Sequence, residues 1–188
     1  MDIRPADLDA LLSLLEAGDG IELIDEFPPF VLEQLPRLVD CDSISYNEVD
    51  PDEGRAVVAL EPSSMRFDGD VEAFSRLMGQ HPVIMWSQRT GDGRALRLSD
   101  FLSQDELHEL EIYREVFRPL ATEYQMSVGL PTAPPTIVGV ALNRDGVLRI
   151  LVEPRGLAAE DALRFPGQSR AVHLEMHHVA DIYGKVLR

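Results

Sequence analysis

The sequence of 188 residues contains one cysteine, Cys41, and no long apolar run. A single cysteine excludes an internal disulfide. No apolar stretch approaches the roughly 18–20 residues that a membrane-spanning helix needs, and the N-terminal segment starts with acidic character and carries no cleavable signal pattern. These absences predict a cytoplasmic protein with one domain over residues 1–188, long enough to bury a hydrophobic core.

Basic residues are also scarce, because 17 Lys and Arg face 33 Asp and Glu and leave a net charge of −16. Proteins that bind nucleic acid place Lys and Arg against phosphates. An acidic surface repels those phosphates and favours solubility. We therefore expect no direct contact between these residues and nucleic acid.

Signatures of catalysis and cofactor binding are missing as well. The sequence has no G-x-S-x-G nucleophile elbow. The Gly91-Asp92-Gly93 segment lacks the third glycine of a dinucleotide-binding loop and the lysine of a P-loop, so a tight turn is the better interpretation. Cys41 stands at the entry to an apolar strand, which predicts a buried, inert thiol. We expect no enzyme activity and no cofactor.

A histidine group near the C-terminus is the one candidate metal site. His173 and His177 are spaced i, i+4 and share a helix face, with His178 next to them. The order is H-x-E-x-H rather than the H-E-x-x-H of zinc proteases, and no third ligand follows at a telling spacing. We expect exposed helix residues and no metal; a pH-sensitive interface is the alternative.

Hydrophobic spacing predicts helices in the first half of the chain. Leucines at 8, 11, 12 and 15 mark an amphipathic helix that ends at the glycines after it. Pro28 and Pro29 suit the first turn of a second helix, which Pro36 should kink or shorten. A third helix covers Val71–Met78, and Pro82 starts a short fourth helical segment.

Strands are predicted from alternation and from turn formers. Ser43–Val49 and Arg55–Leu60 flank five turn-forming residues and form a hairpin. In the first of these strands Ile44, Tyr46 and Glu48 share one face, while Ser45, Asn47 and Val49 share the other. Leu96 and Leu98 mark a short edge strand, and three further strands are expected at Tyr124–Leu130, Thr136–Asn143 and Val147–Glu153.

Ser103 and Glu106 form a capping box at the start of a helix between the short strand and Tyr124. We expect this helix to bury Leu107, Leu110, Tyr113, Val116 and Phe117 and to end at Pro119. The order of helices, hairpin, helices, three strands and helix predicts an α+β fold, with helices on a central antiparallel sheet of five or six strands.

Several segments carry a resemblance to a known family. They are Ser45–Asp50, Arg89–Gly93, Leu98–Ser103, Tyr113–Leu120 and Val140–Arg144, within roughly residues 6 to 143. Together they resemble the GAF-like sensor domain that precedes the DNA-binding domain in LuxR-type bacterial transcriptional regulators. Arg155–Arg170 departs from the family pattern, and the helix-turn-helix domain is absent from these residues. The chain is then either a piece of a longer regulator or a standalone sensor that acts through a partner.

The resemblance implies a ligand pocket between the sheet and the crossing helices. We expect a cavity of a few hundred Å³, bounded by the Trp86 segment, the Tyr113–Phe117 helix and the Tyr124 strand. Core packing is the alternative role of each of these side chains. The candidate lining residues are Trp86, Phe101, Tyr113, Phe117, Tyr124 and Met126.

The C-terminal helix, from about Ser169, shows a heptad seam. Spacings of 4, 3, 4 and 3 are typical of a contact between two helices, and the first helix could complete a four-helix interface. Packing back onto the sheet is the alternative, because further apolar residues widen the stripe. The predicted homodimer residues are Val172, Met176, Val179, Tyr183 and Val186.

These patterns predict a sensor and dimerisation domain of a LuxR-type regulator that takes a small-molecule effector and shifts between two arrangements. A standalone protein-interaction subunit without a ligand is the first alternative. A small-molecule enzyme on a GAF-like scaffold is the second, and it would need polar groups that converge in a cavity.

Overall fold

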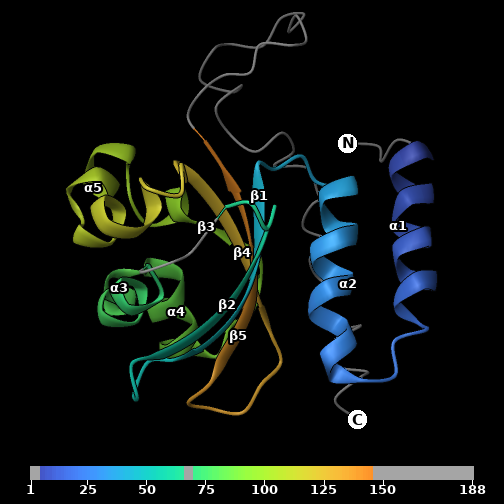
Figure 1. The fold of residues 1–188 in the computed structure, drawn as a ribbon, viewed down its shortest axis with the longest axis horizontal. Coiled ribbons are helices and arrows are strands. Elements are labelled where there is room, and N and C mark those ends of the chain that lie inside the picture. The colour runs from blue at the N-terminus through green and yellow to red at the C-terminus, as the bar shows by residue number, and fades with distance from the viewer. Residues whose placement is uncertain (1–4, 66–69, 146–188) are drawn as a thin grey trace, which may run out of the picture.

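The computed structural model describes residues 5–65 and 70–145, and Figure 1 shows them as one sheet with helices on both faces. All strand pairs are antiparallel, in the order β2-β1-β5-β4-β3. The predicted α+β fold with a five- or six-stranded antiparallel sheet is confirmed. The strands are β1 Ser43–Asp50, β2 Arg55–Glu61, β3 Leu96–Arg97, β4 Tyr124–Leu130 and β5 Ile137–Arg144. The strand predicted at Val147–Glu153 lies outside the described residues.

Helices α1 and α2 cover one face of the sheet, and α3, α4 and α5 cover the other (Figure 1). This division creates two separate interiors, one on each side of the strands. The helices are α1 Pro5–Gly18, α2 Phe27–Gln34, α3 Asp70–Leu77, α4 Pro82–Thr90 and α5 Gln104–Glu109.

The prolines of α2 act as the sequence predicts. Pro28 and Pro29 occupy its first turn, where a missing amide hydrogen costs nothing. The α-helix ends at Gln34 and continues only as the 3₁₀ turn η2, Leu35–Arg37, because Pro36 has no N–H to donate to the preceding turn.

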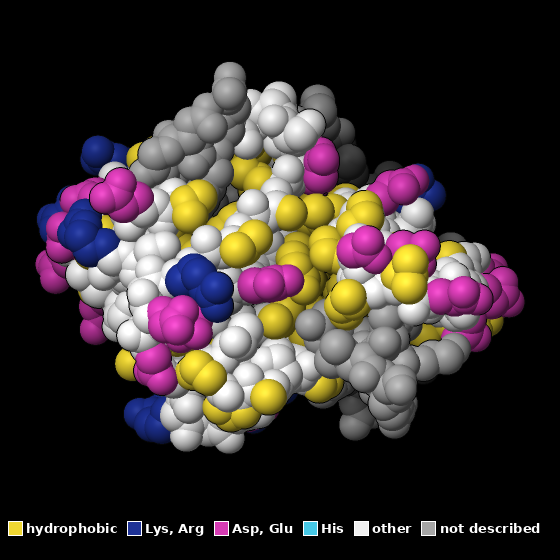
Figure 2. All heavy atoms as spheres, turned by 60° about the horizontal axis from the view of Figure 1, so that its bottom comes forward, with side chains coloured by type: hydrophobic (Ala, Val, Ile, Leu, Met, Phe, Trp, Pro, Cys, Tyr) yellow, Lys and Arg dark blue, Asp and Glu magenta, His cyan; other side chains and the backbone are white. Residues whose placement is uncertain are grey.

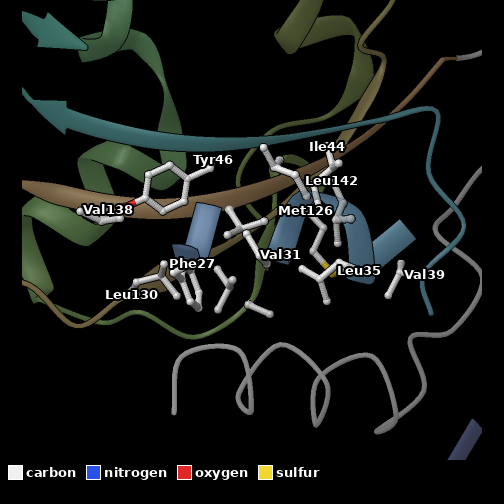
Figure 3. Close-up of a cluster of buried hydrophobic side chains, with 14 of the residues drawn as sticks. Phe27, Val31, Leu35, Val39, Ile44, Tyr46, Met126, Leu130, Val138 and Leu142 are labelled. Atoms are coloured by element: carbon white, nitrogen blue, oxygen red, sulfur yellow. The ribbon is translucent and has the colours of Figure 1, made fainter. Parts of the chain in front are cut away.

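The side of the sheet that faces α2 is packed with apolar side chains. Figure 3 shows Phe27, Val31 and Leu35 of α2 directed toward the strands. Side chains from β1, β4 and β5 meet them, all of them buried. These strand residues are Ile44, Tyr46, Met126, Val128, Leu130, Val138, Val140 and Leu142.

The single helix predicted to start at Ser103 and to end at Pro119 is broken, and that prediction is wrong. The capping box forms: the Glu106 backbone amide donates to Ser103 Oγ (3.3 Å), and the Ser103 amide donates to Glu106 Oε2 (2.8 Å). However, α5 ends at Glu109, and Leu110 takes an extended backbone (φ −70°, ψ 144°).

After this break the chain forms η5, a five-residue π-helical turn over Tyr113–Phe117. Its wider turn is closed by the Arg118 amide, which donates to the Tyr113 carbonyl over 2.8 Å. The break lets Ile112 lie fully buried, and its amide donates to Oε1 of Gln80, the last residue of the 3₁₀ turn that follows α3. Tertiary packing and this hydrogen bond therefore override the helical pattern.

Candidate functional site

The sheet face toward α3, α4 and η5 is polar, unlike the face toward α2. Side chains alternate between the two faces of a strand, so the neighbours of the apolar residues in β1, β4 and β5 point to this second interior. Most of them are small or polar, and they line one cavity together with the apolar Val49 of β1 and Ile137 of β5. The small or polar lining residues are Ser45, Asn47, Gln125, Ser127, Gly129, Gly139, Ala141 and Asn143. Buried polar side chains are costly unless they are hydrogen-bonded, so this face marks a candidate site.

Three buried side chains on this face and His81, the residue before α4, are joined by consecutive hydrogen bonds. His81 Nε2 contacts Gln125 Oε1 at 2.8 Å. Gln125 Nε2 donates to Asn143 Oδ1 over 2.9 Å, and Asn143 Nδ2 donates to Ser43 Oγ over 3.2 Å. These hydrogen bonds connect the start of α4 to β4, β5 and β1.

Of these four hydrogen-bonded side chains only His81 can ionise near neutral pH, and burial determines its protonation state. Its Nδ1 accepts from the Ile84 amide and caps α4, so Nε2 carries the proton that it donates to Gln125. The Phe74 and Phe117 rings pack against the imidazole edge-on. Burial lowers the pKa of His81 to about 4, so the ring is neutral near pH 7.

Two further hydrogen bonds join polar side chains on the same face of the sheet. Asn47 Nδ2 donates to Ser45 Oγ over 3.0 Å, and Ser127 Oγ donates to Gln125 Oε1 over 3.3 Å. Asn47 and Ser127 are half-buried. An incoming molecule that offers both donors and acceptors could replace these contacts without leaving a buried polar group unpaired.

The cavity between this polar face and the helices has a volume of about 80 Å³. The helix side is lined mostly by apolar groups, among them Phe74, Ile84, Val116 and Phe117. Among the described residues, no Asp, Glu, Lys or Arg lines it. The volume falls short of the few hundred Å³ that we expected, because these side chains pack down onto the strands.

Glycines form part of the floor of the cavity. Gly129 and Gly139 are paired across β4 and β5, and both line the cavity. The Gly129 amide donates to the Gly93 carbonyl over 3.0 Å. A Cβ built on Gly129 would lie 2.8 Å from Gly93 Cα, so the approach of the two backbones requires glycine here.

A scan of protein-family models and a search of curated proteins find no match to the chain, whereas solved structures match over nearly its whole length. The VqsR ligand-binding domain of Pseudomonas aeruginosa aligns with a TM-score of 0.59 at 15% identity, covering 95% of this chain and 99% of that one. CepR2 of Burkholderia cenocepacia, an N-acylhomoserine lactone-dependent LuxR-family transcription factor, aligns at 0.60 and 14%, covering 95% of each. This chain has the fold of a LuxR-type ligand-binding domain.

Escherichia coli SdiA in complex with octanoyl-rac-glycerol shares the same LuxR-type fold. It aligns with a TM-score of 0.58 at 14% identity and covers 100% of this chain and 68% of that one. At such low identity the likeness establishes the fold, so the residues of the site have to be argued from this chain itself.

One of the six predicted pocket residues lines the cavity, namely Phe117. Tyr124 and Met126 point to the opposite face of β4 and pack among the apolar side chains between the sheet and α2. The polar residues between and after them, Gln125 and Ser127, are the ones that face the cavity. Whether any of the six contacts a ligand stays a prediction.

Trp86 and Phe101 pair away from the cavity, with their ring centroids 5.9 Å apart. Arg89 and Arg94 lie over the indole at 5.3 and 5.7 Å from its centroid. The buried indole Nε1 has no hydrogen-bond partner among the described residues. Through these contacts Trp86 packs α4 against the turn that follows it.

Tyr113 belongs to a separate polar cluster around Glu123. The Tyr113 hydroxyl donates to Glu123 Oε1, and His108 Nε2 lies 2.7 Å from Glu123 Oε2. Gln104 Nε2 donates to the same carboxylate over 2.7 Å. The cluster ties α5 and η5 to the start of β4, and burial together with the Glu123 hydrogen bond raises the pKa of Tyr113 to about 12.

Sequence reasoning missed His81, Gln125, Ser127 and Asn143. The signal was present, because the alternation that separates Ser45 and Asn47 from Tyr46 continues in β4 and β5. Extending that pattern would have identified the polar face. His81 carried no such signal, since a histidine before Pro82 is equally compatible with an exposed turn.

Among the described residues no group of three or more potential ligands could hold a metal ion, and no described helix is both long and apolar enough to cross a bilayer. The group His173, His177 and His178 lies outside the described residues. So do all five residues of the predicted dimer seam, Val172, Met176, Val179, Tyr183 and Val186.

Proposed function

We propose that this chain is the cytoplasmic sensor and dimerisation domain of a LuxR-type transcriptional regulator, and that an uncharged small molecule binds between the sheet and α3, α4 and η5. The observation that carries the proposal is the polar sheet face over a cavity, opposite an apolar face of the same strands. A domain that needed only stability would favour apolar residues on both buried faces. The structural neighbours are regulators and ligand-binding domains rather than enzymes.

The lining of the cavity defines the class of ligand. Ser45, Asn47, Gln125 and Ser127 offer hydroxyl and amide groups, and His81 is neutral. A charged ligand would be desolvated there with no opposite charge beside it. The helix side offers apolar contacts for the remainder of the molecule. CepR2 is described as dependent on an N-acylhomoserine lactone, and SdiA is described in complex with octanoyl-rac-glycerol. Both of these molecules are likewise uncharged.

Binding requires the cavity to enlarge. Ligand sites for drug-sized molecules usually measure about 300–1,000 Å³, whereas this one measures about 80 Å³. A ligand would therefore select a minor arrangement in which the helices stand further from the sheet. A small cavity is equally compatible with a protein-interaction subunit that binds no ligand. A ligand-binding experiment separates this function from that of a sensor.

The test is a thermal-shift measurement on the whole chain with an N-acylhomoserine lactone, octanoylglycerol and the charged counterpart octanoate. We expect a rise of about 5 °C or more when a neutral ligand is present at 100 times its Kd. Asn47→Leu should abolish the shift, while the adjacent Tyr46→Phe on the opposite face should keep it. No shift with either neutral ligand would favour the ligand-free function.

We further propose that the regulator is a homodimer through the seam Val172, Met176, Val179, Tyr183 and Val186, with the terminal helix carrying the ligand-dependent change outward. The spacing of these residues supports this proposal. A twofold dimer would match paired DNA half-sites contacted by a separate helix-turn-helix domain. The net charge of −16 supports leaving DNA contact to that domain.

A further inference from the structure

Strand β2 is one edge of the sheet. It pairs with β1 on one side, and no described strand lies on its other side. Among the described residues its outward amides and carbonyls make no further backbone hydrogen bond. Unpaired backbone groups along an edge strand are a template for another strand.

The sequence of β2 lacks the usual protection of an edge. Natural edge strands are short or carry Lys, Pro or bulges in their centre. In β2, seven residues long, charge occurs only at the first residue, Arg55, and the last, Glu61. The five residues between them are aliphatic, and Val57 is 57% exposed. An exposed valine on an open edge indicates a surface that gains from being covered.

We propose that a second copy of this chain pairs with β2 in antiparallel fashion, with Val58 opposite Val58 of the partner subunit. In this register Arg55 lies opposite Glu61 of the partner subunit, and the twofold axis repeats the pair at the other end. The opposite charges at the ends of a short apolar strand are therefore self-complementary. Shifting the register by two residues would lose both pairs and expose apolar side chains.

The same register covers apolar side chains on both faces of the strand. Val57 lies opposite Ala59 of the partner subunit, on the face toward α2. On the cavity side, Ala56 lies opposite Leu60 of the partner subunit. Cross-strand pairs of this kind and opposite charges placed directly across a ladder each stabilise antiparallel pairing.

Arg55 and Glu61 are available for these contacts. The Arg55 guanidinium lies 3.7 Å from Glu53 and 4.0 Å from Asp50 of its own hairpin, yet its side chain is 68% exposed. Glu61 Oε2 accepts from the Ser63 amide over 2.8 Å. A carboxylate accepts several hydrogen bonds, so this local contact leaves Glu61 able to meet an arginine.

The test is site-specific cross-linking, which reports this surface separately from the C-terminal seam. In a Cys41→Ser background, Val58→Cys should form a disulfide-linked dimer under mild oxidation, because symmetric residues face each other across the twofold axis. Val57→Cys is the matched control. It is more exposed, but the two copies of position 57 are offset by about 7 Å along the strands and lie beyond disulfide reach.

Charge reversal at the strand ends is the second part of the test. Adding Arg55→Glu to Val58→Cys places like charges at both ends, and the cross-linked fraction should fall about tenfold or more. Adding Glu61→Arg as well should restore it. The proposal is overturned if Val58→Cys fails to cross-link at 100 µM, if Val57→Cys cross-links equally well, or if the charge reversals have no effect. None of these outcomes depends on ligand binding.

Discussion

At the scale of single residues, His81 shows how a side chain that titrates near neutrality is held in one state. Its Nδ1 caps α4, its Nε2 donates to Gln125, and its ring lies between Phe74 and Phe117. Protonation would replace the accepting Nδ1 with a second donor facing the Ile84 amide. The hydrogen-bond geometry and the burial therefore both favour the neutral ring.

Because of this, we expect the free energy of unfolding to fall between pH 6.5 and pH 4. The unfolded chain binds a proton at His81 near pH 6.5, whereas the folded chain binds it only near the lowered pKa of about 4. The unfolded state thus holds more protons in this window, and acid favours unfolding by up to about 3 kcal/mol. Urea denaturation at several pH values measures the slope.

His81→Gln is the variant that isolates this contribution. The substitution should lower the free energy of unfolding at pH 7.5 by about 1–3 kcal/mol, since the hydrogen bonds of the buried His81 are lost or distorted. The free energy of unfolding of the variant should vary less between pH 5 and 7 than that of the wild type. His108→Gln, at a half-exposed histidine, should keep most of the wild-type slope. An unchanged slope in His81→Gln would show that another group causes the pH dependence.

At the scale of elements, the segment before β3 and strand β4 approach each other more closely than side chains allow. A Cβ on Gly93 would lie 2.7 Å from the Gly129 carbonyl oxygen, and one on Gly129 would lie 2.8 Å from Gly93 Cα. The backbone hydrogen bond between them holds the turn after α4 against the sheet. Because of this contact, the part of the cavity floor at Gly129 has no side chain.

We therefore expect Gly129→Ala to destabilise the fold by about 1–3 kcal/mol, because a methyl group would force the two backbones apart. Gly79→Ala is the matched control, since nothing lies within 4 Å of a Cβ at that position. It should be neutral or slightly stabilising. Equal midpoints of chemical unfolding for the two variants would contradict the close contact.

At the scale of the whole molecule, one sheet separates an apolar interior from a second interior in which polar groups on the strands face apolar groups on the helices. Figure 2 shows that the outer surface carries many carboxylates, with hydrophobic side chains gathered at the centre of the displayed face. An acidic surface favours solubility, and repulsion between copies has to be overcome locally by apolar and complementary contacts. Assembly therefore depends on particular surfaces.

The proposed C-terminal seam would be one such surface, and we expect Val179→Asp combined with Val186→Asp to weaken self-association. Two buried carboxylates would be desolvated in a helix contact. Sedimentation velocity at tens of micromolar measures the change against the wild type. A monomeric wild type would contradict the seam, as would an unfolded double variant, which would place these residues in the core.

The sequence by itself determined the α+β class, the β1–β2 hairpin, the shortening of α2 at Pro36 and the capping box at Ser103. Each of these depends on residues a few positions apart, whose spacing and backbone preferences are local. The overall charge, and with it the case against direct nucleic-acid contact, is likewise a property of composition.

Tertiary structure alone decided where the cavity lies and what lines it. Tyr124 and Met126 looked like pocket residues, but pairing of β4 with β5 turns them toward α2 and presents Gln125 and Ser127 instead. The break at Leu110 and the burial of His81 likewise depend on contacts with segments far away in the sequence. Such contacts are fixed only when the whole chain packs, because strand register and the depth of helix packing have no local signature.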